Sequence, residues 1–173
     1  EIAKTREVYW NITPEVGAFL HQLILENKYQ TALEIGTSTG YSAIWLASAL
    51  EKTKGQLYTI ESNFKKRYPI ALENFHKSGL TNISPILGHA PEAIPQTPTL
   101  FDLAFFDATK HEHCDYFAAL ADRIKIGGMI ITDNITSHRQ ELRSYIDTIN
   151  DLPNWHSSEK DLGTGLLISQ KIS

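Results

Sequence analysis

Short apolar runs alternate with longer stretches of helical periodicity along most of the chain. A short run bounded by polar residues or glycine is typical of a buried strand, and apolar residues at intervals of three and four are typical of a helix with one buried face. Strands that alternate with helices form a parallel sheet covered by helices on both faces, so the pattern predicts an α/β fold. We expect strands at residues 31–35, 57–60, 83–87, 101–106 and 129–132, with helices at 14–28, 40–51, 64–78, 112–124 and 138–152.

Local signals set the ends of some of these elements. Thr13-Pro14 is typical of a helix start, because threonine caps free amide groups and proline fits the first helical position. Gly127-Gly128 predicts a turn before the fifth strand. Runs near residues 155–158 and 166–169 predict a hairpin added to one edge of the sheet.

The composition is that of a globular protein. The length of 173 residues predicts a single domain over residues 1–173, and 42% apolar with 21% charged residues exclude a disordered chain. No apolar run approaches the roughly 18 residues of a membrane span, so we expect no membrane partner. Residues 1–6 include the charged Glu1, Lys4 and Arg6 and show no signal peptide. The chain begins at Glu1, which leaves open whether residues precede it.

The charge and the cysteine content limit which binding partners and which cellular compartment we expect. The net charge of −4 gives no overall basic field for nucleic acid, although a local basic patch stays possible. Cys114 is the one cysteine, so the chain has neither an internal disulfide nor a cysteine-based structural zinc site. A single cysteine also fits a reducing compartment, and we expect a cytoplasmic protein.

The turn after the first strand carries two glycines. Gly36 allows a sharp turn and a close approach of backbone to a ligand, and Gly40 stands at the helix start, where free amide groups favour an anionic or polar group. The Gly-x-x-x-Gly spacing is neither the dinucleotide fingerprint nor a Walker loop. A plain strand-to-helix turn explains it equally well.

An acidic residue ends the second strand. Glu61 stands where doubly wound folds usually hold the hydroxyl groups of a ribose. The alternative is a solvated carboxylate at a strand end.

Polar residues also end the fourth and fifth strands. Asp107 follows one strand, Asp133 and Asn134 follow the other, and the carboxyl ends of neighbouring parallel strands share one edge of a sheet. Three oxygen donors without cysteine suit Mg²⁺, Ca²⁺ or Mn²⁺. From the spacing alone, two independent strand-end caps remain the alternative.

Residues 34–42, Glu-Ile-Gly-Thr-Ser-Thr-Gly-Tyr-Ser, resemble motif I of class I S-adenosylmethionine-dependent methyltransferases. More closely, the chain is similar to the cation-dependent O-methyltransferases of the catechol and caffeoyl-CoA type, and the similarity runs from Ile12 to the last strand. It implies a Rossmann-like three-layer sandwich with a seven-stranded, mostly parallel sheet and an antiparallel C-terminal strand. The cofactor contacts that it implies are Ile12, Gly36, Ser38, Ser42, Glu61, His89, Ala90 and Asp107. Relatives often have an acidic residue where His89 stands.

The same resemblance implies the catalytic groups. Asp107, Asp133 and Asn134 would bind a divalent cation, most simply Mg²⁺, and Lys110 would be the base, with Asp107 beside it. A lysine beside a cation releases its proton more easily, which suits a base. His113 departs from the family, where an aromatic residue is common, as does Thr109, where many relatives have aspartate.

His111 and His113 could suggest a second metal site. We interpret them as a surface pair at a helix start. Arg139 and Arg143 could meet an anionic substrate, but ordinary exposed helix residues are the simpler interpretation.

The resemblance therefore implies methyl transfer from S-adenosylmethionine to an oxygen of a metal-chelating, hydroxylated small molecule. A homodimer is expected, since the short segments around the acceptor side leave a pocket that a second subunit could complete. Three alternatives stay open: methylation of a hydroxylated uridine in tRNA, a cofactor-binding module without turnover, and a nicotinamide-dependent oxidoreductase. The missing Gly-x-Gly-x-x-Gly fingerprint argues against the last.

Overall fold

A computed structural model describes residues 10–98 and 100–173 of the chain. It contains one seven-stranded sheet with the strand order β3-β2-β1-β4-β5-β7-β6. The strands are β1 (Thr31–Ile35), β2 (Gln56–Glu61), β3 (Ile83–Leu87), β4 (Phe101–Phe106), β5 (Ile124–Asp133), β6 (Trp155–Lys160) and β7 (Leu166–Lys171). The residues on which the expectation about a signal peptide rests lie outside the described part.

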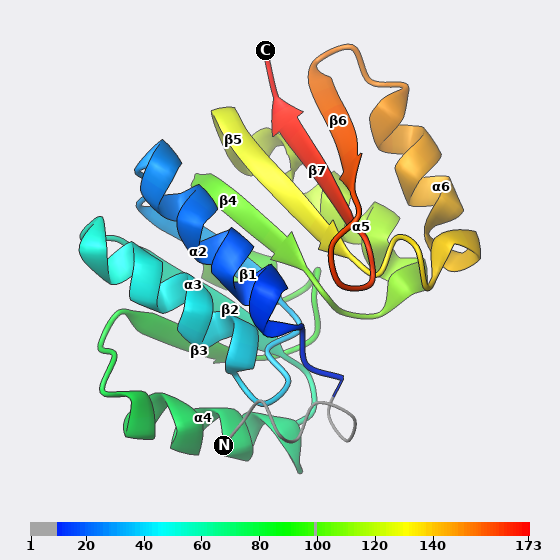
Figure 1. The fold of residues 1–173 in the computed structure, drawn as a ribbon. Helices are drawn as coiled ribbons and strands as arrows, with labels where there is room; N and C mark the ends of the chain where they lie inside the picture. The colour runs from blue at the N-terminus through cyan, green and yellow to red at the C-terminus, as the bar shows by residue number, and fades with distance from the viewer. Residues whose placement is uncertain (1–9, 99) are drawn as a thin grey trace.

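The first five strands run parallel to one another, and β7 runs antiparallel to both of its neighbours, β5 and β6. The predicted α/β fold with a mostly parallel seven-stranded sheet is therefore confirmed, as is the hairpin at one edge. Because β7 is reversed, its start lies at the same edge as the carboxyl ends of the parallel strands. Figure 1 shows the β6–β7 turn next to the segment that follows β5.

Helices cover both faces of the sheet (Figure 1). They are α2 (Pro14–Asn27), α3 (Tyr41–Lys52), α4 (Arg67–Ser78), α5 (His113–Leu120) and α6 (Arg139–Asn150), with short 3-10 turns η2 (Ile94–Gln96), η3 (Lys110–Glu112) and η4 (Ala121–Arg123). Among the described residues, no helix is both long and apolar enough to cross a bilayer.

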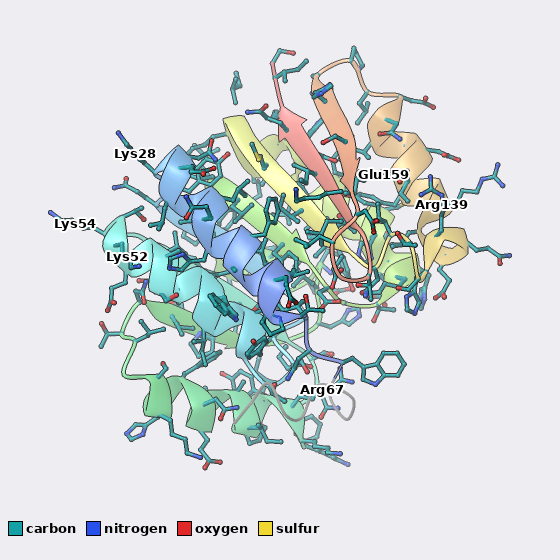
Figure 2. The ribbon with its side chains drawn as sticks, viewed as in Figure 1. Lys28, Lys52, Lys54, Arg67, Arg139 and Glu159 are labelled. Carbon is teal, nitrogen blue, oxygen red and sulfur yellow. The ribbon has the colours of Figure 1, made fainter. Side chains whose placement is uncertain are left out.

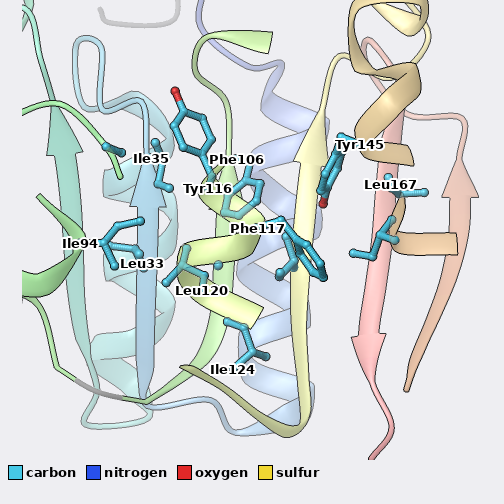
Figure 3. Packing of buried hydrophobic residues seen from close by; sticks show 14 of the residues in the cluster. Leu33, Ile35, Ile94, Phe106, Tyr116, Phe117, Leu120, Ile124, Tyr145 and Leu167 are labelled. Atoms are coloured by element: carbon cyan, nitrogen blue, oxygen red, sulfur yellow. The ribbon is translucent and has the colours of Figure 1, made fainter. Parts of the chain in front are cut away.

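Each face of the sheet has its own buried cluster. On one face, apolar side chains of α2 and α3 such as Leu20 and Leu46 pack against strand residues such as Phe105. On the other face, Phe117 of α5 and Tyr145 of α6 belong to the same cluster as strand residues such as Leu33 and Phe106 (Figure 3). Because successive side chains of a strand point to opposite faces, the apolar strands serve both clusters. The core thus fixes the strand ends at which the polar residues stand.

Two of the boundaries that differ from the prediction have a visible local cause. β5 begins at Ile124 and runs through Gly127-Gly128, where we expected a turn. The pairing with β4 shifts register there, and a Cβ at Gly128 would lie too close to the Asp102 carbonyl oxygen. The two glycines therefore allow an irregularity inside the strand instead of a turn before it. α4 begins at Arg67 because the Asn63 side chain accepts the Lys66 amide in a preceding turn.

Candidate active site

A cavity of about 1040 Å³ opens at the sheet edge where the parallel strands end. Its walls come from the segments that follow β1, β2, β3, β4 and β5, together with the segment before α2 and the β6–β7 turn. All but one of the predicted site residues line it: Ile12, Gly36, Ser38, Glu61, His89, Ala90, Asp107, Lys110, Asp133 and Asn134. Ser42 is the exception, being buried in the first turn of α3 outside the cavity wall.

The turn after β1 is held by neighbouring strands. The amides of Gly36 and Thr37 both donate to the Ile60 carbonyl, over 3.0 and 3.2 Å. Gly36 has a φ of +103°, and a Cβ there would overlap the carbonyl oxygen of Asp107. Only glycine therefore allows β1 and the segment after β4 to approach this closely.

The Glu61 carboxylate is held from both sides. Oε2 accepts the Ser38 amide at 2.7 Å and Oε1 accepts the Asn63 amide at 2.8 Å. The side chain is only 4% exposed, so the alternative of a solvated strand-end carboxylate is wrong. A carboxylate offers about four acceptor positions, which leaves capacity for two further donors such as sugar hydroxyl groups.

Beneath this turn lies Glu34, which we did not predict as a site residue. It is fully buried in β1, where its Oε2 accepts the Thr59 hydroxyl at 2.5 Å and its Oε1 has no hydrogen bond. Burial raises its pKa to about 7; the nearby hydroxyl groups of Ser42 and Thr59 lower that pKa, and Asp107 and Glu61 raise it. A charged residue inside an apolar strand is the signal that could have identified it.

The segment after β4 carries a partly buried ion pair. Lys110 Nζ lies 3.1 Å from Asp107 Oδ1, and the two side chains are 13% and 17% exposed. Lys110 opens the η3 turn, so its ammonium group reaches back to the end of the strand. The pair brings the predicted base into contact with a predicted cation ligand.

Asp133 and Asn134 end β5 at the same cavity. The backbone N–H of Asn134 donates to Asp133 Oδ1 at 2.7 Å, and the Thr164 hydroxyl donates to the same oxygen at 2.7 Å. Asn134 Nδ2 donates to the Thr164 hydroxyl at 2.9 Å. Burial, followed by repulsion from Asp107, raises the pKa of Asp133 to about 6. Thr164 also lines the cavity, and we did not predict it.

These donors fit a small hard cation. Asp107, Asp133 and Asn134 line one cavity, and they offer carboxylate and amide oxygens of the kind that Mg²⁺, Ca²⁺ and Mn²⁺ take. The repulsion between the two carboxylates is of the kind that a divalent cation relieves. Within the described residues, no three His, Cys, Asp or Glu side chains gather as a metal-binding group, so the candidate site rests on two carboxylates and one amide.

His89 bridges two segments of the cavity wall. Its Nδ1 lies 2.9 Å from Glu92 Oε2 and its Nε2 lies 3.2 Å from Glu112 Oε1. The hydrogen bond to Glu92, followed by the contacts with Glu112, raises the pKa of His89, while burial opposes the shift. The bridge links the segment after β3 to η3, and Ala90 beside it is buried.

His111 and His113 do not form the expected surface pair. The His113 side chain is fully buried among Phe106, Tyr116 and Tyr145, with its Nδ1 3.1 Å from the Thr109 carbonyl oxygen. Burial lowers its pKa to about 4. The His111 side chain is 78% exposed, so the two imidazoles do not converge on a second metal site.

The arginines divide between the cavity and the surface. Arg139 forms a two-pronged ion pair with Glu159 at 2.9 and 3.0 Å (Figure 2), and Arg143 contacts Asp147. Both are exposed helix residues, as predicted. Arg67, also labelled in Figure 2, is the last of three consecutive basic residues, Lys65, Lys66 and Arg67, and it lines the cavity.

Comparisons with known proteins agree with this geometry. A family model described as O-methyltransferase matches residues 2–143. A catechol O-methyltransferase from Niastella koreensis is 35% identical over 72% of this chain and 58% of its own length. A caffeoyl-CoA O-methyltransferase from Petroselinum crispum is 32% identical over 72% of this chain and 55% of its own length. The chain thus spans little more than half the length of these relatives.

Solved structures share the fold. The O-methyltransferase from Bacillus cereus in complex with SAH superposes with a TM-score of 0.86 at 26% identity, covering 93% of this chain and 82% of that one. The O-methyltransferase TomG from Streptomyces achromogenes in complex with SAM superposes with a TM-score of 0.88 at 23% identity, covering 99% of this chain and 87% of that one. Since the family model covers most of the sequence and a relative above 30% identity matches 72% of it, this chain belongs to the O-methyltransferase family.

Proposed function

We propose that this chain is an S-adenosylmethionine-dependent, divalent-cation-dependent O-methyltransferase that acts on a small molecule with neighbouring hydroxyl groups. One observation carries the proposal: three oxygen-bearing side chains and the Lys110 ammonium line the same cavity as the Glu61 carboxylate. Family membership supports the reaction type, and the donor set supports the cation.

The cofactor would lie along the segments that follow β1, β2 and β3. Ser38 and Gly36 form the turn that would meet its methionine part, and Glu61 has acceptor capacity left for its ribose hydroxyl groups. Ala90 would line the adenine side. S-adenosylmethionine supplies a sulfonium methyl group, so transfer forms an O–C bond and breaks an S–C bond.

Asp107, Asp133 and Asn134 would hold the cation. A divalent cation bound there would lower the pKa of an acceptor hydroxyl group and hold two neighbouring oxygens in place. The chain contributes the base: Lys110 is kept at the cavity wall by Asp107, and a cation beside it would favour its neutral amine form, which takes the hydroxyl proton. Protein packing on both sides of the sheet keeps these side chains at fixed strand ends.

An RNA acceptor is the second candidate, because Arg67 brings one residue of the basic run 65–67 to the cavity. We favour a small molecule because the wall also carries the carboxyl groups of Glu61, Asp107 and Asp133, which repel phosphates. A cofactor-binding module without turnover would bind the same ligands and form no methylated product. The homodimer and the cytoplasmic location stay predictions.

Calorimetry tests the proposal. The protein saturated with S-adenosylhomocysteine is titrated with catechol, first with Mg²⁺ and then with EDTA. We expect catechol binding only with Mg²⁺. In a separate assay with methyl-labelled S-adenosylmethionine in place of S-adenosylhomocysteine, we expect transfer of the label to catechol, again only with Mg²⁺. Catechol binding that ignores the chelator would overturn the cation dependence.

Two variants sharpen the test. Asp133→Ala should abolish methyl transfer and keep the affinity for S-adenosylhomocysteine, because its carboxylate belongs to the predicted cation side. Asp151→Ala changes an exposed aspartate just after α6 and should leave both unchanged. Equal loss of transfer and of cofactor affinity in Asp133→Ala would indicate a structural role instead.

A further inference from the structure

The Thr164 hydroxyl group connects the two side chains that end β5. It lies 2.7 Å from Asp133 Oδ1 and 2.9 Å from Asn134 Nδ2. A hydroxyl has one proton to donate, and an ionised carboxylate only accepts, so that proton goes to Asp133. The hydroxyl must then accept from Asn134, which fixes the amide nitrogen on the Thr164 side.

These hydrogen bonds leave one oxygen of each side chain available. With its nitrogen directed to Thr164, the Asn134 amide presents its oxygen elsewhere, and oxygen is the atom that a hard cation takes. On Asp133, Oδ1 accepts both the Thr164 hydroxyl and the backbone N–H of Asn134. Neither of these bonds uses Oδ2. One hydroxyl group therefore sets which oxygen of each side chain is offered.

The backbone holds Thr164 firmly in place. Thr164 lies in the β6–β7 turn between Gly163 and Gly165, which have φ values of +61° and +87°. The Ile135 amide donates to the Gly165 carbonyl at 3.1 Å, and the Thr136 amide donates to the Thr164 carbonyl at 3.0 Å. A Cβ at Gly165 would overlap the Thr136 side chain, so the turn is pressed against the segment after β5.

The contact also explains the backbone of Asn134. Its φ of +70° lies in the left-handed region, which is sparsely populated outside glycine and persists where the surroundings determine it. Carbonyl groups of the β6–β7 turn accept the amides of the three residues that follow Asn134, and the Thr164 hydroxyl accepts from the Asn134 side chain. They hold the segment in this conformation.

We propose that Thr164 is a positioning residue that orients both Asp133 and Asn134 toward a divalent cation. The inference rests on the proposed function, because it concerns the same cation. Partners of this kind fix the direction of a ligand's lone pairs, and their loss commonly weakens metal affinity by about 10–100-fold.

Calorimetric titration of Mn²⁺ into the full chain saturated with S-adenosylhomocysteine tests the proposal. Thr164→Val keeps the shape of the side chain and removes the hydroxyl group, Thr164→Ser keeps the hydroxyl group, and Thr148→Val makes the same change at an exposed position on α6. We expect Thr164→Val to weaken the Mn²⁺ Kd by about 10–100-fold and to leave the S-adenosylhomocysteine Kd within about twofold. Thr164→Ser should restore most of the Mn²⁺ affinity, and Thr148→Val should match the unchanged protein.

The outcomes separate the two proposals. Unchanged Mn²⁺ affinity in Thr164→Val, or a parallel loss of Mn²⁺ and S-adenosylhomocysteine binding, would overturn the positioning role alone. Failure of the unchanged protein to bind Mn²⁺ would overturn the cation site itself and the positioning role with it.

Discussion

Replacing Glu34 with glutamine should make the protein less sensitive to rising pH. In the folded state the carboxyl group is fully buried, which raises its pKa from 4.5 to about 7. The unfolded chain therefore loses this proton first, and the folded protein loses stability as pH rises from about 4.5 to 7. The pKa difference corresponds to about 3 kcal/mol at alkaline pH. Glutamine is nearly the same size, carries no charge, and can still accept the Thr59 hydroxyl group.

Urea unfolding at pH 5 and pH 8, without metal or cofactor, measures this effect. The stability of Glu34→Gln relative to the unchanged protein should grow by about 2–3 kcal/mol between these pH values, because part of the penalty is already present at pH 5. For a domain of this size that is about 1 M urea in the midpoint. Glu51→Gln replaces an exposed glutamate and should show no such growth. A stability difference that is equal at both pH values would refute the reasoning.

Three further predictions follow from the same geometry. Lys110→Met should lower kcat by about 10²–10⁴-fold while calorimetry finds the S-adenosylhomocysteine Kd unchanged, since Lys110 is the proposed base and is not among the predicted cofactor contacts; an unchanged kcat would exclude Lys110 as the base. Burial lowers the pKa of His113 to about 4, so the protein loses stability as pH falls from 6.5 toward 4, and His113→Phe should lose less; melting curves at pH 5 and 8 check this, and equal acid sensitivity would contradict it. Gly36→Ala should lower the free energy of unfolding, measured in urea, clearly more than Gly79→Ala. Both glycines have positive φ, but only a Cβ at Gly36 would meet backbone atoms; similar losses would show that the close approach of β1 to the segment after β4 is unimportant.

Much of the fold could be predicted because local and tertiary preferences agree. β1, β3 and β4 have the predicted limits, since each apolar run ends at a residue that suits a turn. The first half of β5 was missed because Gly127-Gly128 has the local signature of a turn. Its strand pairing depends on the Asp102 backbone, which is remote in the chain and leaves no local trace.

The site residues also fall into those that the sequence predicts and those that depend on distant parts of the chain. Asp107, Asp133 and Asn134 could be placed together because parallel strands end at one edge. Thr164 could not, because its place depends on the reversed strand β7 and on how far the hairpin turn reaches. Glu34 was detectable in principle as a charge in an apolar strand, and His113 was misplaced because a helix start is usually exposed.

The position of β7 between β5 and β6 has a consequence for how the protein is made. The ribosome must release the β6–β7 hairpin before the Thr164 hydroxyl can reach Asp133, because residues 155–171 are made after β5 and form the strands beyond it. Until then β5 is an open edge, which neighbouring chains could pair with. Nascent chains that stop short of this hairpin should therefore be both inactive and prone to aggregate.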